Sequence, residues 1–203
     1  MKMVILGKGG SGKSTVSALL ARGLARKGYS VLVIDSDESN FGLHRQLGME
    51  EPRELMEQLG GRRGAGRQIM ESAREGKSIG PLDGNFGTAD IPPGCLSIKD
   101  GVRLLQIGKV KHFGEGCACP IGVLASDFLE RLRLAEREVA IVDTEAGLEH
   151  LGRGVERGAD LVLMVMDPSF ESLRLRDKVS TMLEEAGKPL FFVLNRTRPE
   201  YGP

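Results

Sequence analysis

Residues 7–15 read Gly7-Lys-Gly-Gly-Ser-Gly-Lys-Ser-Thr15, and this stretch decides the fold. It matches the pattern G-x-x-x-x-G-K-[ST], in which a glycine-rich loop lets backbone N–H groups converge on phosphate oxygens. An apolar run at residues 4–6 precedes it, and apolar residues at helical spacing follow it from 13 to 27. A strand before the loop and a helix after it are the setting that this motif requires, so a phosphate-binding loop is predicted here.

Short apolar runs alternate with helical patterns along the rest of the chain. Strands are expected at residues 31–34, 104–107, 139–142, 161–166 and 190–194, and helices at 52–59, 121–137 and 169–185. One face of the second of these helices is marked by Ile121, Leu124, Phe128, Leu132 and Ala135. Strands that are apolar throughout are typical of a sheet covered on both faces. The sequence therefore predicts an α/β, three-layer P-loop NTPase fold with a mostly parallel central sheet.

Length and composition favour a single domain over residues 1–203. Glycine, proline and polar residues dominate from about 60 to 100, so we expect an irregular insertion that begins with a flexible basic loop at 60–67. Lys+Arg and Asp+Glu are both 28, so zero net charge predicts no stable binding to nucleic acid or an anionic membrane. Three cysteines without a disulfide-like framework favour a reducing compartment, and a cytoplasmic location is predicted.

Each residue of the loop has an expected role in holding MgATP. Lys13 should reach the β- and γ-phosphates, the Ser14 hydroxyl should ligate Mg²⁺, and Thr15 should support the α-phosphate. The helix that starts near Lys13 adds the positive end of its dipole. The backbone of the remaining loop residues should cradle the phosphates: Gly9, Gly10, Ser11 and Gly12.

A second lysine, Lys8, stands at the start of the loop. In this the loop resembles the deviant Walker A motif of the MinD/ParA-like ATPases. The resemblance implies that Lys8 crosses a dimer interface to the nucleotide of the other subunit. There it would offset charge on the transferring phosphoryl group, as an arginine finger does in trans. The alternative is a solvated lysine beside an already positive site.

Three carboxylates follow the ends of predicted strands, where ligands of open α/β sheets bind. Asp37 is expected to orient the attacking water, and Asp35 to act on the Mg²⁺ shell. Asp143, at the end of Val-Ala-Ile-Val-Asp, is expected to hold Mg²⁺ through water, and Gly147 frees the following loop to sense the γ-phosphate. Such acids can also do no more than cap a following helix.

The last predicted strand ends at Asn195-Arg-Thr-Arg198, where a guanine-reading protein would have an aspartate at the fourth position. Asn195 alone can pair with the amino group and ring nitrogen of adenine, which favours ATP over GTP. An ordinary turn residue is the alternative interpretation.

Two cysteines, Cys117 and Cys119, lie in Gly114-Glu-Gly-Cys-Ala-Cys-Pro-Ile-Gly122. Neighbours two residues apart diverge in a strand or a helix, so both thiolates can share one metal only from a bent loop. Two ligands per chain fall short of the four that Zn²⁺ or thiolate-bound Ni²⁺ usually takes, and a twofold axis would supply the rest. The alternative is two small buried residues in a tight turn. Cys95 has no partner at ligand spacing and is read as a lone loop thiol.

Four stretches together resemble the CooC-type ATPases, which serve nickel insertion into carbon monoxide dehydrogenase. They are residues 8–15, Gly114-Glu-Gly-Cys-Ala-Cys-Pro120, Asp143-Thr-Glu-Ala-Gly-Leu-Glu-His-Leu-Gly-Arg-Gly154 and Asp167-Pro-Ser-Phe-Glu-Ser172. The resemblance implies a MinD-like fold, an ATP-dependent homodimer, Cys117 and Cys119 as shared Ni²⁺ or Zn²⁺ ligands, and carbon monoxide dehydrogenase as client. Glu145 would relay nucleotide state to the metal, and His150 is read as a structural hydrogen-bonder rather than a ligand.

Members of that family are expected to continue past the strand before Asn195 with another strand and helix. We therefore expect either a truncated C-terminus or a short variant, with one sheet edge and part of the adenine pocket incomplete.

Two other functions share parts of this pattern. A partitioning or positioning switch of the MinD/ParA kind would use the same P-loop, and the basic stretch at Arg62, Arg63 and Arg67 fits it. No amphipathic C-terminal helix with a basic face is seen, which weighs against that reading. An iron–sulfur ATPase could also use four thiolates across a dimer.

Overall fold

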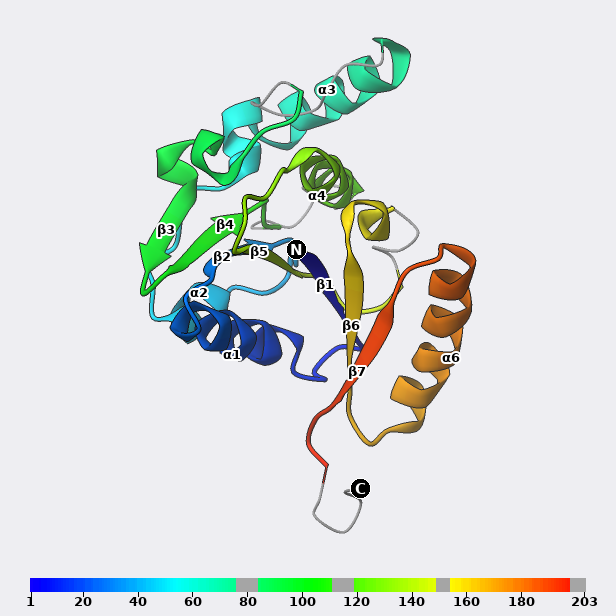
Figure 1. Ribbon diagram of the computed structural model, residues 1–203. Helices are drawn as coiled ribbons and strands as arrows, with labels where there is room; N and C mark the ends of the chain where they lie inside the picture. The colour runs from blue at the N-terminus through cyan, green and yellow to red at the C-terminus, as the bar shows by residue number, and fades with distance from the viewer. Residues whose placement is uncertain (76–83, 111–118, 149–153, 198–203) are drawn as a thin grey trace.

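The computed structural model describes residues 1–75, 84–110, 119–148 and 154–197. Its strands form a seven-stranded sheet of order β3-β4-β2-β5-β1-β6-β7, in which neighbouring pairs are parallel except β3 with β4 (Figure 1). The bounds are β1 Lys2–Leu6, β2 Ser30–Asp35, β3 Leu96–Lys99, β4 Val102–Gln106, β5 Glu138–Asp143, β6 Leu161–Met166 and β7 Leu190–Leu194.

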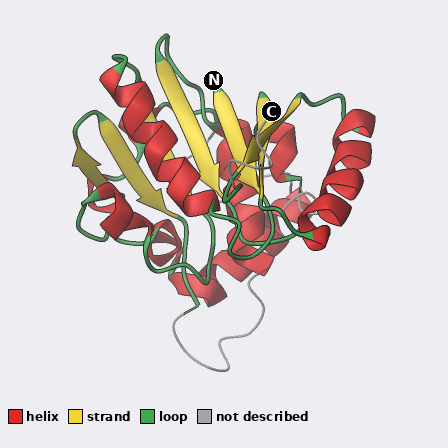
Figure 2. Cartoon of the chain, turned by 90° about the horizontal axis from the view of Figure 1, so that it is seen from below, coloured by secondary structure: helices red, strands yellow, loops and turns green. Residues whose placement is uncertain are grey.

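Helices cover the sheet on two sides, as Figures 1 and 2 show. The α-helices are α1 Lys13–Arg26, α2 Leu43–Leu47, α3 Gly61–Glu75, α4 Cys119–Arg131 and α6 Phe170–Glu185. Within the described ranges, four 3-10 helices span Leu55–Leu59, Thr88–Asp90, Pro93–Cys95 and Val155–Gly158. The α/β, three-layer P-loop NTPase fold with a mostly parallel central sheet is confirmed. Among the described helices, none combines the length and apolar character needed to cross a membrane.

Successive residues of the central strands enter two separate cores. Val4 and Leu6 of β1 pack into the core that contains α4, while Met3 and Ile5 pack into the core that contains α1 and α2. Strand β2 divides its side chains in the same way. This two-sided burial is the reason that these strands are apolar at nearly every position.

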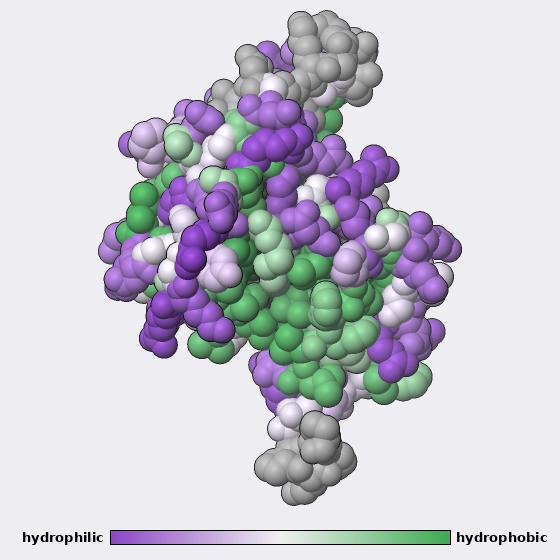
Figure 3. Space-filling model, in the orientation of Figure 1, coloured by the Kyte–Doolittle hydropathy of each residue, from purple (hydrophilic) through white to green (hydrophobic). Residues whose placement is uncertain are grey.

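Strand β7 departs from the expectation that the strands are covered on both faces. It lies at the edge of the sheet, paired with β6, and Phe191, Phe192 and Leu194 are 54%, 44% and 62% exposed. Figure 3 shows a broad apolar area on this face of the molecule, over the part of the sheet where β6 and β7 lie.

The prediction of a flexible basic loop at residues 60–67 is wrong, because α3 begins at Gly61. Ala65 is fully buried, and Ile69, four residues further on, packs against the same core. The packing of these two apolar side chains, one helical turn apart, thus favours the helix by more than the glycines of the segment disfavour it. The expected irregular insertion also contains strand β3, which closes the sheet edge beside β4.

Smaller differences concern the ends of elements. Helix α4 ends at Arg131 rather than 137, so Ala135 lies beyond it and is exposed, whereas the other four residues of its predicted face are buried. The helix expected at 52–59 is a 3-10 helix over Leu55–Leu59, and the short α2 was not predicted.

Two glycines of α3 offer a matched test of this helix. A Cβ on Gly64 would collide with the carbonyl oxygen of Leu59, whereas a Cβ on Gly66 would meet nothing within 4 Å. We expect Gly64→Ala to lower the free energy of unfolding by about 1–3 kcal/mol through overpacking. Gly66→Ala should raise it by about 0.5–1 kcal/mol, because alanine favours the helix. Urea unfolding of both variants measures the difference, and equal effects at the two positions would contradict the packing of α3.

Candidate nucleotide site

The predicted site residues gather where parallel strands end. In the register of the sheet, β5 lies between β1 and β2, and Asp143 is paired with Ile5 on one side and Asp35 on the other. The phosphate loop leaves β1 at this same edge. A cavity of about 320 Å³ opens here, lined by Gly9, Gly10, Gly12, Lys13, Ser14, Thr15, Asp37, Ser39, Asn40, Gln46, Ala146 and Arg196.

Two positions, Gly7 and Gly12, show why the loop contains glycine. Gly7 has a φ of 150°, and a Cβ there would meet the carbonyl oxygen of Val165 and the Ser11 hydroxyl. Gly12 has a φ of 102° and is the N-cap of α1, so the chain turns sharply into the helix at this residue. A backbone of this kind is open to glycine and strained for other residues. The loop therefore presents a helix N-terminus to the cavity, the arrangement that binds phosphate.

Lys13 is the first residue of α1 and is buried beside the loop. Its ammonium donates to the carbonyl oxygen of Lys8 at 3.3 Å. Burial lowers the pKa of Lys13, while the Asp143 carboxylate acts in the opposite direction. The predicted phosphate lysine thus lines the cavity and lies within the field of the strand-end acids.

Asp143 is fully buried, and its carboxylate faces the start of α1. Its Oδ1 accepts from the Ser17 hydroxyl at 3.0 Å, while Oδ2 has no hydrogen-bond partner among the described residues. Burial raises the pKa of Asp143, and the neighbouring hydroxyls of Ser14 and Ser17 oppose that change. The unpartnered oxygen of this buried carboxylate and the nearby Ser14 hydroxyl together form an all-oxygen set of donors, which is the kind that Mg²⁺ binds. These residues fit the predicted metal of a MgATP site.

The loop after β2 reaches from the carboxylates to the phosphate loop. The Asp37 carboxylate accepts from the backbone N–H of Ser39 at 2.9 Å and from its hydroxyl at 2.7 Å. The Asn40 amide then donates to the Ser14 hydroxyl at 2.7 Å. Asp37 lines the cavity, as a residue that orients water would have to do.

Asp35 has a partner that the sequence analysis did not single out. The ammonium of Lys109 donates to Asp35 Oδ2 at 2.8 Å, and both side chains are buried. Burial raises the pKa of Asp35 to about 7, although the Lys109 ammonium lowers it. The carboxylate predicted for the Mg²⁺ shell is therefore held by an internal cation, and its role toward Mg²⁺ stays a prediction. Nothing in the sequence around Lys109 pairs it with an acid 74 residues earlier.

Asn195 lies directly against the phosphate loop. Its side-chain amide donates to the carbonyl oxygen of Ser11 at 2.8 Å, and a Cβ on Gly12 would collide with the same amide nitrogen. Arg196, the next residue, lines the cavity. The position is compatible with a nucleotide-facing role, and recognition of adenine stays a prediction.

Lys8 contacts two acids of its own chain. Its ammonium lies 3.0 Å from Asp167 Oδ2 and 3.3 Å from Glu171 Oε2. The hydrogen bond to Asp167 is the main reason that the pKa of Lys8 is raised. The hydroxyls of Ser169 and Ser172 in turn hold the pKa of Asp167 down, to about 2. In one copy of the chain, Lys8 is thus directed toward the start of α6.

The predicted metal ligands are described only in part. Cys117 and His150 lie outside the described residues, and Cys119 is the first residue of α4. Cys95 is buried at the end of the 3-10 helix Pro93–Cys95, and it forms no disulfide with another described residue. Across the described ranges, no three His, Cys, Asp or Glu residues come together as a metal site. The shared cysteine site stays a prediction.

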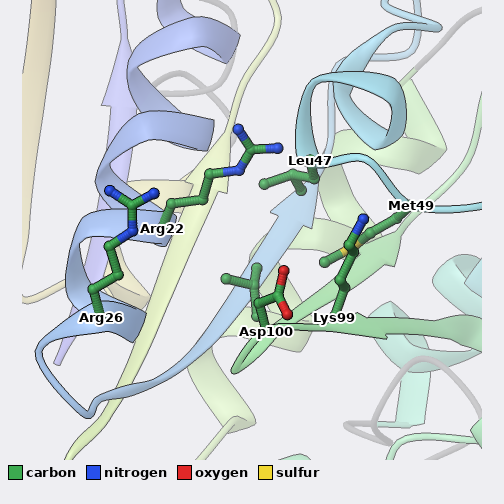
Figure 4. Close-up of a pocket in the computed structure, with 7 residues that line it drawn as sticks. Arg22, Arg26, Leu47, Met49, Lys99 and Asp100 are labelled. Atoms are coloured by element: carbon green, nitrogen blue, oxygen red, sulfur yellow. The ribbon is translucent and has the colours of Figure 1, made fainter.

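A second hollow, of about 180 Å³, lies away from the phosphate loop, where β3 turns into β4. Arg22 and Arg26 reach it from α1, and Lys99 and Asp100 from the β3–β4 turn (Figure 4). The Lys99 ammonium donates to the carbonyl oxygen of Gly48 at 2.9 Å. None of the residues predicted to bind nucleotide lines this hollow.

A glycine-rich loop at a helix N-terminus, a phosphate lysine and a strand-end aspartate together define a P-loop nucleotide-binding ATPase. Residues 2–202 match the CobQ/CobB/MinD/ParA nucleotide binding domain, so the chain belongs to that family of ATPases.

Three known proteins show how far the similarity extends. An uncharacterized ATP-binding protein of Methanocaldococcus jannaschii is 47% identical over 98% of this chain and 80% of its own length. The carbon monoxide dehydrogenase accessory protein CooC of Rhodospirillum rubrum is 32% identical over 97% of this chain and 74% of its own length. The septum site-determining protein MinD from Pyrococcus horikoshii, solved with Mg-ADP, has a TM-score of 0.64 at 22% identity, covering 98% of this chain and 74% of that one. The last similarity establishes the fold.

Gly12 tests the phosphate loop without touching a charged group. We expect Gly12→Ala to lower the affinity for MgADP by at least about tenfold, because the new Cβ is strained at this φ and collides with the Asn195 amide. Gly23→Ala is the control on the same helix, since its Cβ would meet nothing within 4 Å. Isothermal titration of both variants gives the affinities. Parental binding by Gly12→Ala would show that the loop does not hold the phosphates as described.

Proposed function

We propose that the chain is an ATP-dependent nickel metallochaperone for maturation of carbon monoxide dehydrogenase. It works in the cytoplasm as a MgATP-driven homodimer whose metal site is shared by Cys117 and Cys119 of both copies. The observation that carries the proposal is a Cys-x-Cys pair in a P-loop ATPase. Over 97% of its length, this chain is 32% identical to CooC. Nickel is the cargo in this proposal, and Zn²⁺ is the alternative metal.

The geometry supports the nucleotide half of the proposal. Lys13 and the backbone of the loop bind the phosphates, while Ser14 would ligate Mg²⁺ directly and Asp143 would hold it through water. Bound Mg²⁺ would neutralise charge on the phosphate oxygens. Asp37 orients the water that attacks the γ-phosphate. Lys8 then offsets charge on the phosphoryl group of the facing copy, as a trans-acting cation does in other NTPases.

The loop after β5 connects the nucleotide to the rest of the chain. The Thr144 hydroxyl donates to the carbonyl oxygen of Ile5 at 2.7 Å. The backbone N–H of Gly147 donates to the carbonyl oxygen of Gly7 at 3.3 Å. Gly147 has a φ of 102°. This loop therefore contacts the phosphate loop at Gly7 and carries Glu145, the residue proposed to relay nucleotide state to the metal.

Metal stoichiometry tests the shared cysteine site. Equilibrium dialysis of the reduced protein should give about one Ni²⁺ per two chains, because each copy supplies two of about four ligands. Cys117→Ser and Cys119→Ser should each abolish this binding. Cys95→Ser is the control. Cys95 is buried in the core and lies far from Cys117 and Cys119 in the sequence, so this substitution should leave the stoichiometry unchanged.

Two outcomes would reject the metal site. Ni²⁺ binding by both cysteine variants at the parental level would exclude thiolate ligands. A protein that stays monomeric on size exclusion with Ni²⁺, Zn²⁺ and a slowly hydrolysed ATP analogue would exclude sharing. The anaerobic visible spectrum of the same preparation separates nickel from the iron–sulfur alternative, because a cluster absorbs as a brown chromophore.

The trans role of Lys8 has a direct test by mixing variants. Lys8→Ala should bind MgATP but hydrolyse it slowly, because its partner supplies no lysine. Lys13→Ala should bind nucleotide poorly yet still carry Lys8. An equal mixture should recover hydrolysis well above the sum of the two variants measured alone, since a mixed dimer has one complete site. Mixed Lys8→Ala and Lys8→Met samples are the control. Purely additive rates in the first mixture would place the action of Lys8 within its own chain.

A further inference from the structure

Lys109 is a buried cation directly behind the nucleotide site. Its side chain is 0% exposed, and the ammonium contacts both the Asp35 carboxylate and the carbonyl oxygen of Asp37. It also lies over the ring of Phe41, 5.9 Å from the ring centroid. Lys109 does not line the cavity that the phosphate loop opens, whereas Asp37 does. The lysine therefore contacts the residues that face the nucleotide and lies behind them.

A gain in stability alone is a weak reason to bury the Lys109 ammonium. Removing an ammonium from water costs several kcal/mol, and an apolar residue of similar volume often replaces a buried ion pair without loss. A buried pair instead fixes the geometry of the groups that it contacts. The groups fixed here are both ends of the turn from Asp35 to Asp37, one through a side chain and one through the backbone.

The backbone around Lys109 strengthens this hold. The N–H of Ile107 donates to the carbonyl oxygen of Asp35 at 3.0 Å, and the N–H of Val110 donates to that of Glu38 at 3.1 Å. Residues 107–110 thus run alongside residues 35–38 beyond the ends of β4 and β2. The Glu54 carboxylate accepts from the N–H of Lys109 at 3.2 Å, so the lysine is itself held in place.

The hydrogen bonds continue from this turn to the phosphate loop. Asp37 Oδ1 accepts from Ser39, and Asn40 in the same loop donates to the Ser14 hydroxyl. A shift of the turn would therefore move the Asp37 carboxylate relative to Ser14. Displacements of about 1 Å at a reacting centre are enough to slow an enzyme about a hundredfold.

We propose that Lys109 is a positioning residue for ATP hydrolysis, which holds the Asp35–Asp37 turn so that the Asp37 carboxylate faces the attacking water. It does not line the cavity of the phosphate loop and acts through Asp37, which does. The inference rests on the water-orienting role of Asp37 in the proposed function, and it is independent of the cysteine metal site.

The first test separates hydrolysis from binding. Lys109→Met keeps the length of the side chain and removes the donor. We expect kcat to fall by at least about tenfold while the affinity for MgADP stays within about threefold of the parent, because the phosphate loop is untouched. Lys109→Gln retains a donor for the carbonyl oxygen of Asp37 and should keep more of the parental kcat than Lys109→Met does. If Lys109→Met does not fold, kcat and MgADP affinity are compared between Lys109→Gln and the parent instead.

The second test asks whether Lys109 acts through Asp37. Lys109→Met should slow the parent but leave Asp37→Asn no slower, because the carboxylate that Lys109 positions is already gone. A merely structural role would slow both backgrounds by the same factor and would lower MgADP affinity as well. Either that result or a parental kcat in Lys109→Met overturns the proposal.

The cycle also separates this inference from the proposal on which it rests. If Asp37→Asn hydrolyses ATP at the parental rate, the water-orienting role of Asp37 is wrong, and the positioning role of Lys109 is wrong with it. If Asp37→Asn is slow while Lys109→Met is not, the role of Asp37 stands and only the role of Lys109 is rejected. Loss of Ni²⁺ binding in the cysteine variants affects neither result.

Discussion

The pairing of β5 with both β1 and β2 is the constraint on which the site depends. It places Asp143 between the strand that leads into the phosphate loop and the strand that ends in Asp35. A slip of one residue would turn the Asp143 side chain to the other face of the sheet. The carboxylate would then lose Ser17, and its oxygen would no longer lie beside Ser14. The slip would also exchange the side chains of β5 between the two cores into which they pack, so the packing of these cores helps to position the chemistry.

Buried charge is concentrated at this edge of the sheet. Lys13, Asp35, Asp37, Lys109 and Asp143 are all buried among the described residues. Such groups are costly to bury, and they accumulate where a protein needs charges held in a fixed arrangement. Two of them, Lys13 and Asp37, line the cavity, while Lys109 and Asp35 form a second layer that holds the first. The site is therefore ordered in depth, with two lining groups in front and a buried ion pair behind them.

The sequence predicted what is encoded locally. The phosphate loop is a contiguous motif, and strands buried on both faces are apolar throughout, so both were recognisable without coordinates. Helix α3 was missed because its glycines suggested a loop, while the burial of Ala65 depends on tertiary packing. The pair of Lys109 with Asp35 was missed for a related reason, since it joins the end of β2 to the segment that follows β4, and these strands meet only in the folded sheet. The exposed apolar residues of β7 likewise could not be told from buried ones by hydropathy alone.

The contacts of Lys8 show how a trans-acting lysine can be compatible with a stable single copy. Asp167 is fixed by the hydroxyls of Ser169 and Ser172, so it offers the ammonium a defined partner near the surface. A partly exposed pair of this kind contributes little stability, because water and salt compete with it. Lys8 can therefore leave Asp167 and Glu171 at small cost when a stronger anion becomes available. In the proposed dimer, the triphosphate of the facing copy is that anion, and the same exchange would connect the presence of ATP to the closing of the interface.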